Sequence, residues 1–423
     1  MRRAWLLAVL FLFQCRPAGA ADSAAGSTLD WHGSVLANYA SRLGTTRHNK
    51  PPSGDFLLGE ERLQLQLSGT APGGGAGYFT KTDFLRDETT AASAVDVREA
   101  YLTYAKGSLD FRIGRQIHTW GVGDLLFIND LFPKNYAALF SGRPMEYLKT
   151  GAGSLKASVY SDKTSLDIIA IPVFEPDQFP TSQSFFLFDP FSQVTNRVEA
   201  RPRHDLGNAE LAARLYRPIM GFDAALYAYH GFFRTPSMEP DSITAPSKLT
   251  IVYPRLAVYG ASLQGNAAGG VVSFEAGYYD SRQDRGGTDP LIPNSQTRFL
   301  AGYQRSPWTD FTAGLQYYGE YMQNYNRYAA SFPAGLPKQD RLRQLLTLRL
   351  TQFLKYQTWK LSLFSFWSPT DKDFYLIPEA ACHVTDELTA TVGANVFGGA
   401  SNNTFMGQLD KNDNLYLSMR YEF

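Results

Sequence analysis

The chain has 423 residues, of which 44% are hydrophobic, 14% aromatic and 19% charged. Its 40 Lys and Arg residues balance its 40 Asp and Glu residues, so overall charge gives no reason to expect a nucleic-acid partner. Only one of the two cysteines, Cys382, lies after the first twenty residues, which excludes an internal disulfide and a cysteine-based metal site in that part of the chain.

Residues 1–20 are typical of a secretory signal peptide. Arg2 and Arg3 form the basic start, an apolar run follows, and small residues ending at Ala20 form a cleavage site. The alternative is a membrane anchor helix, but the apolar run is shorter than the roughly 20 residues that such a helix needs. We predict cleavage after Ala20 and export to the outer membrane of a Gram-negative bacterium.

After residue 20, apolar and polar residues alternate with a period of two. The alternating segments are about 9–11 residues long, the length with which a tilted strand crosses a bilayer. We expect eighteen strands, near residues 30–40, 59–69, 77–86, 95–106, 108–115, 148–160, 163–174, 207–217, 220–232, 248–264, 269–281, 295–306, 308–321, 340–354, 356–367, 372–384, 386–397 and 413–423.

The connections between these strands alternate between short and long. Short periplasmic turns and long outer loops are typical of outer-membrane barrels. Residues 21–423 are therefore expected to form an all-β fold, a transmembrane antiparallel up-and-down β-barrel of about 18 strands (16–18). The alternative is a soluble sandwich or propeller; the long strands and the lack of a 40–50-residue repeat argue against it.

The last strand carries the clearest alternation. Leu415, Leu417, Met419, Tyr421 and Phe423 share one face, and polar residues separate most of them. A final strand with an aromatic carboxyl-terminal residue resembles the closing strand of bacterial outer-membrane barrels. The resemblance implies recognition by the barrel assembly machinery and contact with outer-membrane lipid.

The same parity separates a lipid face from a lumen face. In strand 340–354 the leucines Leu346, Leu348 and Leu350 face outward, because a charge on the lipid face costs roughly 2–4 kcal/mol at the midplane. The arginines either attract anionic solutes or pair with the glutamates and stiffen the wall. The predicted pore-lining residues are Arg62, Glu99, Arg112, Arg214, Arg255, Glu275, Arg298, Glu320, Arg341, Arg343, Arg349 and Arg420.

The connection at 116–147 is the most distinctive segment. Trp120, Phe127 and Phe132 are too apolar to extend into water, so we expect this loop to fold inward, with a helix near 136–140, and to narrow the pore. The residues predicted at this constriction are Arg115, His118, Trp120, Asp124, Asp130 and Lys134.

A family resemblance rests on this segment. Gly114-Arg115-Gln116, then Trp120-Gly121 and Asp124, precede Asp130-Leu131-Phe132-Pro133. The pattern resembles a proteobacterial outer-membrane porin family of largely uncharacterised members, similar in style to alginate-export-type porins. The motifs cover residues 112–135, and the architecture covers most of the chain. The resemblance implies an eighteen-stranded channel whose candidate lumen cations are Arg112, Arg115, Arg298, Arg341, Arg343 and Arg349.

Catalytic and metal-binding motifs are missing from the sequence. It contains no G-x-S-x-G, H-E-x-x-H or P-loop motif, so we expect no enzyme and no cofactor. Acidic residues in two outer loops either bind calcium or are solvated charges; they are Asp284, Asp289, Asp410 and Asp413.

These observations together predict a porin. It would let small or extended polar solutes, including anionic ones, diffuse passively or be exported. The alternatives are a substrate-specific carrier with a plugged lumen and a membrane-embedded barrel hydrolase. The sequence leaves open whether the protein is a monomer or a trimer.

Overall fold

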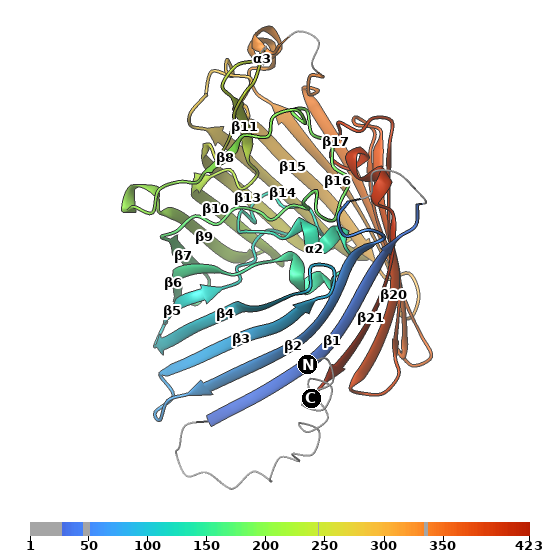
Figure 1. Ribbon diagram of the computed structural model, residues 1–423. Helices are drawn as coiled ribbons and strands as arrows, with labels where there is room; N and C mark the ends of the chain where they lie inside the picture. The colour runs from blue at the N-terminus through green and yellow to red at the C-terminus, as the bar shows by residue number, and fades with distance from the viewer. Residues whose placement is uncertain (1–27, 45–50, 244, 334–336) are drawn as a thin grey trace.

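The computed structural model describes residues 28–44, 51–243, 245–333 and 337–423. The predicted signal peptide lies outside these residues. Eighteen strands form one closed barrel (Figure 1). They are β1 (Thr28–Arg42), β2 (Phe56–Thr70), β3 (Ala76–Asp87), β4 (Ala92–Lys106), β5 (Leu109–Gln116), β6 (Ala152–Tyr160), β7 (Ser165–Ile171), β9 (Glu210–Ile219), β10 (Phe222–Phe232), β13 (Arg255–Ala267), β14 (Gly270–Ser281), β15 (Gln296–Arg305), β16 (Phe311–Met322), β17 (Leu342–Leu354), β18 (Trp359–Ser368), β19 (Asp373–His383), β20 (Leu388–Gly399) and β21 (Asn414–Glu422).

Each barrel strand pairs antiparallel with the barrel strand before it and the one after it, and β1 also pairs with β21 to close the ring. The prediction of an eighteen-stranded antiparallel barrel is confirmed. Three short strands stand apart in a small sheet of their own within the long loops. They are β8 (Arg197–Ala200), β11 (Ser237–Pro240) and β12 (Leu249–Val252).

Short turns lie at one end of the barrel and the long loops at the other (Figure 1). Met220-Gly221 and Ala268-Gly269 both place two successive residues at positive φ. That conformation is the type I′ turn, whose twist matches the twist of the strands it joins. The short-turn end is called the lower end below, and the long-loop end the upper end.

In the described part of the chain, helices are few and short. They are α2 (Tyr136–Phe140), α3 (Tyr325–Ser331) and three 3₁₀ turns: η1 (Met145–Leu148), η2 (Leu206–Asn208) and η3 (Gly407–Asn412). Within the described residues, none of the helices has both the length and the apolar character needed to cross a membrane. The helix expected near 136–140 is confirmed as α2.

The two faces of the barrel wall differ in chemistry. Exposed apolar side chains cover the outer face, among them Leu67, Phe84, Leu102, Ile113, Leu226, Phe274, Leu315, Val392 and Leu417. The inner face instead buries polar and charged groups, among them Gln64, Ser262, Glu275, Gln316 and Thr347. An apolar exterior around a polar interior is the inverse of a soluble protein and suits a barrel surrounded by lipid.

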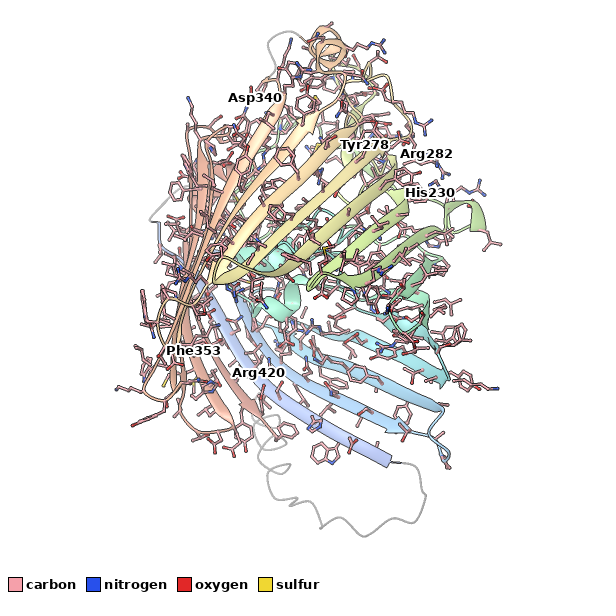
Figure 2. All side chains as sticks on the ribbon, turned by 180° about the vertical axis from the view of Figure 1, so that it is seen from behind. His230, Tyr278, Arg282, Asp340, Phe353 and Arg420 are labelled. Atoms are coloured by element: carbon pink, nitrogen blue, oxygen red, sulfur yellow. The ribbon has the colours of Figure 1, made fainter. Side chains whose placement is uncertain are left out.

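Large aromatic side chains gather near both ends of the outer face. Trp31, Trp308 and Trp359 are exposed near the lower end. Tyr278 and Trp367 are exposed near the upper end, where His230 and Arg282 are bonded to each other at 2.9 Å (Figure 2). Two aromatic belts flanking an apolar band are typical of barrels at the membrane interfaces.

The ends of β1 and β21 meet in a tight contact. Gly33 and Phe423 exchange two backbone hydrogen bonds of 2.9 Å, and the Phe423 ring lies 5.9 Å from the ring of Trp31. A Cβ atom on Gly33 would lie 2.3 Å from the Phe423 ring. Only glycine therefore lets this ring cover the seam of the barrel.

One predicted strand differs from the structure. The segment expected at 248–264 is divided into β12 and β13, and Pro254, which cannot donate a ladder hydrogen bond, lies between them. Within β13, Leu256 and Val258 face inward and join the apolar cluster of the lumen, so Arg255 lies on the opposite face with the exposed Tyr259. Arg255 also bonds to Asn208 in an upper loop. Arg255 therefore belongs to the outer rim rather than to the lumen where we predicted it.

Candidate functional site: the lumen and its inward loop

The connection between β5 and β6, residues 117–151, lies inside the barrel; we call it the inward loop (Figure 1). Trp120, Ile128, Phe132 and Phe140 are each at most 7% exposed and join one apolar cluster with inward residues of β7 to β20. Burying these side chains against the wall is the main source of stability for the loop. Its aromatic residues, which identified it in the sequence, are the ones that hold it in the lumen.

Glu275 of β14 fixes the first half of the loop. Its carboxylate accepts hydrogen bonds from the backbone N–H groups of Val122, Gly123 and Asn129, at 2.8–3.1 Å, and from the Asn129 side chain at 3.0 Å. Four donors around one buried carboxylate compensate for the loss of its hydration. Among the described residues no cation pairs with Glu275. The hydrogen-bond donors of the loop alone therefore offset the free-energy cost of burying this carboxylate.

Glu60 of β2 fixes the second half of the loop. It accepts two hydrogen bonds from Arg143, at 2.9 and 2.5 Å, and a third from Arg62 of its own strand at 3.1 Å. In the ring of eighteen strands, β2 and β14 are nine strand-to-strand steps apart in either direction. The inward loop is therefore anchored to opposite walls.

Tyr147, in η1, lies between two arginines of the wall. The guanidinium carbons of Arg62 and Arg98 are 4.4 and 4.2 Å from its ring centroid. The neighbouring Glu146 pairs with Arg98, Lys81 and Arg420. The cation–π contacts and the ion pairs form one partly buried cluster, because Arg98 takes part in both.

Asp130 and Lys134 form an ion pair inside the loop, 2.8 Å apart and each 2% exposed at the side chain. Asp130 also pairs with Lys149 at 2.7 Å. Complete burial lowers the pKa of Lys134, although Asp130 and Asp177 oppose that shift. Burial likewise raises the pKa of Asp177, which accepts a hydrogen bond from the Lys134 backbone, to about 6. These charges organise the loop interior and do not face an open pore.

His118 is buried at the start of the loop. Its Nε2 atom lies 2.8 Å from the Ser154 hydroxyl, and its ring lies 4.8 Å from that of Phe132. Burial, aided by Lys156 and Arg112, lowers the pKa of His118 to about 4. A Ser–His contact is two thirds of a hydrolytic triad, but no carboxylate bonds to this imidazole among the described residues and both side chains are buried.

Most of the predicted lumen arginines are paired. Arg214 pairs with Asp167 at 2.7 Å, Arg298 with Glu320 at 3.7 Å, and Arg343 with Asp371 at 2.5 Å. Each pair joins neighbouring strands or a strand and a loop, and so cross-links the wall. This arrangement favours the wall-stiffening interpretation over the anion-attracting one.

Four further residues predicted in the lumen or at the constriction contact the inward loop, a neighbouring carboxylate or an aromatic ring. Glu99 accepts a hydrogen bond from the backbone of Ile117 at 3.0 Å, and Arg112 lies 4.0 Å from Asp110. Arg115 bonds to Glu175 of the next loop at 2.7 Å. Arg341 precedes β17 at the upper rim, 5.0 Å from the ring of Tyr321.

Asp124, at the tip of the loop, bonds to Arg349 of β17 at 2.8 Å. Their side chains are 33% and 48% exposed, so this pair remains accessible in the lumen. Next to the pair is a cavity of about 250 Å³ between the loop tip and the lower parts of β13 to β17. Asp124 and Arg349 thus lie at the accessible edge of the loop.

Several partners of these residues escaped prediction. Glu60, Asp83, Asp167 and Arg98 are all buried in ion pairs of the inner wall. Strand parity would have identified all three carboxylates: Glu60 has the parity of Arg62 and Gln64, and Asp83 and Asp167 precede the exposed Phe84 and Ile168. Arg98 lies at an irregularity between β3 and β4, where Glu99 and Val97 pair with consecutive residues of β3, and no alternation could place it.

The sequence matches the family described as "Protein of unknown function (DUF1302)" over residues 37–420. The chain belongs to this family. A search of curated proteins found none that matches it. The match covers all eighteen barrel strands in part or whole, so the barrel described above is the DUF1302 region itself.

Solved structures similar to this DUF1302 member are barrels of distant sequence. OccK11 (OpdR) of Pseudomonas aeruginosa is 10% identical, with a TM-score of 0.53 over 93% of this chain and 96% of that one. A mutant of the Rh. blastica porin is 11% identical, with a TM-score of 0.44 over 94% and 100%. A loop deletion mutant of OmpT from Vibrio cholerae is 9% identical, with a TM-score of 0.45 over 94% and 100%. At these sequence identities, the similarity to these structures concerns the fold alone.

The acidic outer-loop residues have other partners. Asp284 accepts hydrogen bonds from the backbones of Thr288 and Asp289, and Asp413 accepts one from the backbone of Phe397. Across the described part of the chain, no three His, Cys, Asp or Glu residues are grouped so as to hold a metal ion. Asp284 thus caps a local turn, and Asp413 caps the end of a strand.

Proposed function

We propose that this protein is a channel of the bacterial outer membrane through which small polar solutes diffuse passively. One observation carries the proposal: a closed barrel with an apolar exterior and a polar interior holds a loop braced between opposite walls. A soluble protein would gain nothing from such an exterior, and a polar interior is typical of outer-membrane barrels, water-filled porins among them. The inward loop would set the constriction, as the sequence predicts.

We infer that charge preference in this channel is weak. Arg214, Arg298 and Arg343 each have a carboxylate partner, and Arg349 has Asp124. A paired arginine contributes little net field to a pore, so the arginines do not support a strong preference for anions. Passage or export of anionic solutes, which the sequence analysis included among the polar solutes, stays a prediction.

Single-channel recording tests the proposal. The purified full chain would be refolded, checked by its heat-dependent mobility on a gel, and inserted into a planar bilayer with a salt gradient. We expect discrete conductance steps and a reversal potential close to zero. Absence of conductance in folded, inserted protein would contradict the open channel, and a large anionic reversal potential would contradict weak selectivity.

A second candidate is a carrier that is plugged at rest. It is favoured by the extent of the apolar cluster, in which the inward loop contacts residues from β7 on one side to β20 on the other. A plugged carrier would be silent in the bilayer and would conduct once Glu275 is neutralised. A channel would conduct in both forms, so one pair of recordings separates the two candidates.

We also infer the route of this protein to the membrane. The segment 1–20 would be removed after Ala20, and the assembly machinery would recognise β21 and Phe423. Amino-terminal sequencing of the membrane-extracted protein tests the cleavage, with residue 21 as the expected first residue. Reduced surface assembly of Phe423→Ser in cells, with normal refolding in detergent, would support the second inference.

A further inference from the structure

The lower parts of β13 to β17 form an unusual stretch of the inner wall. Apart from Val271 and Arg349, their inward side chains are amides and hydroxyls, namely Ser262, Gln264, Ser273, Gln304, Gln316 and Thr347. The lower parts of β5 to β9 instead carry Asp110, Arg112, Lys156, Asp167 and Arg214. The lower interior therefore has one side rich in charged groups and one side on which uncharged polar groups predominate, called the uncharged side below.

The cavity of about 250 Å³ lies against the uncharged side. Gln264, Ser273, Gln304, Gln316 and Thr347 all line it, and the loop tip, residues 122–124, closes one edge. Its volume is near the lower limit for small-molecule sites and matches a solute of about monosaccharide size.

Hydrogen-bonding capacity in the cavity is largely unused. The Gln316 carbonyl oxygen accepts a hydrogen bond from the Asp124 backbone at 3.1 Å, which fixes the direction of that amide. The side chains of Gln264, Ser273 and Gln304 bond to no other residue of the described chain. A glutamine amide offers two donors and an acceptor, and a hydroxyl offers both roles, so this wall can bond to hydroxyl groups from several directions.

The charged groups at the cavity cancel each other. Asp124 and Arg349 form a 2.8 Å ion pair and both line the cavity. Because the pair is partly exposed, its remaining oxygen and N–H groups can still bond to a solute. A net charge on that solute would find no opposite unpaired charge among the lining residues.

We propose that this cavity is a binding site for a small, neutral, hydroxyl-rich solute, the chemistry of a monosaccharide or polyol. The inference rests on the proposed channel function, since the site would lie on the solute path. It goes further by assigning a substrate class and by placing the site on β13 to β17.

Equilibrium titration of the folded protein in detergent tests the site without depending on conductance. Glucose is the neutral probe, and gluconate is its anionic match in size and hydroxyl content. Ligand-observed NMR would follow both. We expect saturable glucose binding and gluconate binding weaker by about fivefold or more, as expected for a charge that is desolvated without a partner.

Variants locate the binding. Gln264→Leu with Gln304→Leu removes two unbonded amides at nearly constant volume, and we expect glucose binding to weaken by about tenfold. Ser273→Ala, a smaller change, should weaken it by about threefold. Gln66→Leu is the matched control, because Gln66 is an inward amide of β2 on the other side of the barrel, and it should leave binding unchanged.

Three results would overturn the site: no saturable glucose binding by folded protein, gluconate binding as tight as glucose binding, or an equal loss in the Gln66 control. Conductance recorded on the same preparation separates the two proposals. Glucose binding without conductance would contradict the channel and leave the site standing. Conductance without glucose binding would contradict the site and support the channel.

Discussion

Glu275 and Asn129 are joined by two hydrogen bonds to the same carboxylate oxygen, one from the Asn129 backbone at 2.8 Å and one from its side chain at 3.0 Å. They lie 146 residues apart in the chain, yet this contact decides where the inward loop sits in the lumen. The carboxylate is the acceptor for a turn that would otherwise have unbonded N–H groups facing the wall.

Neutralising Glu275 should loosen the loop. Glu275→Gln replaces one acceptor oxygen with an NH₂ group that opposes the loop N–H groups, and we expect the free energy of unfolding to fall by about 2–4 kcal/mol. In bilayers the variant should show larger and noisier conductance steps than the wild type. Glu379→Gln is the matched control, since Glu379 bonds to Tyr416 and Lys360 of the wall and to no inward-loop residue. Equal effects of both variants would refute the anchoring role.

The Asp124–Arg349 pair should control ion selectivity. Asp124→Asn leaves Arg349 unpaired beside the lumen and should shift the reversal potential toward anions. Arg349→Gln leaves Asp124 unpaired and should shift it toward cations, and the double variant should return close to the wild-type value. Shifts of the same sign in both single variants would show that the pair does not face the conducting path.

Acid should weaken the packing around His118. The pKa of His118 is about 4 in the folded protein against an ordinary value of 6.5, so folding favours the neutral imidazole. Its contribution to stability is complete above pH 6.5 and is lost as the pH falls toward 4, by at most about 3 kcal/mol. Urea unfolding in micelles at several pH values measures this loss.

Comparison with His118→Gln isolates that contribution. Asp177, whose pKa is raised to about 6, acts in the opposite direction, because the folded state holds its proton more tightly and gains relative stability as the pH falls below 6. Since both proteins retain Asp177, its effect cancels in the difference between them. A difference that stays constant between pH 7 and pH 4 would contradict the assignment to His118.

The contribution of Tyr147 to stability should come from its aromatic ring and hardly from its hydroxyl group. Tyr147→Phe keeps both cation–π contacts with Arg62 and Arg98, and loses only a 3.5 Å contact to Gln64. Tyr147→Leu removes both cation–π contacts and should lower the free energy of unfolding by about 2–3 kcal/mol. Unfolding curves of the two variants should differ clearly, and similar losses would point to the hydroxyl.

Substitutions of Gly33 and Phe423, which meet where β1 pairs with β21, should have strongly non-additive effects on stability. Gly33→Val places atoms where the Phe423 ring lies and should destabilise the barrel by about 1–3 kcal/mol. Phe423→Ala should lower that penalty when both changes are combined, since the clash disappears with the ring. Additive losses in the double-mutant cycle would mean that ring and glycine act independently.

The fold was predictable because one physical rule applies along the whole wall. Leu63, Leu65 and Leu67 must face lipid, so Arg62 and Gln64 must face inward, and the register of each strand follows. The rule fails where the inner wall is itself apolar, as at Leu256 and Val258, and the predicted inward position of Arg255 failed with it. The small sheet of β8, β11 and β12 was missed because strands of four residues are too short to show a period.

The site was predictable only in part. The aromatic residues identified the inward loop, and parity placed Glu275 on the inner wall. Which loop atoms bond to Glu275, and which loop carboxylates pair with Arg349 and Arg420, depends on contacts between residues more than a hundred positions apart. Nothing in local sequence encodes such pairings, so the predicted anion preference could not be tested before the partners were known.

The attachment of the inward loop to β2 on one side and β14 on the other has a mechanical consequence. A thin-walled cylinder yields most easily by flattening into an oval, and a strut across its diameter opposes that deformation. Lateral pressure from the surrounding bilayer would therefore be transmitted through Arg143 and Asn129 and would strain the loop between them. The element that narrows the passage and the element that keeps the shell round are the same piece of chain.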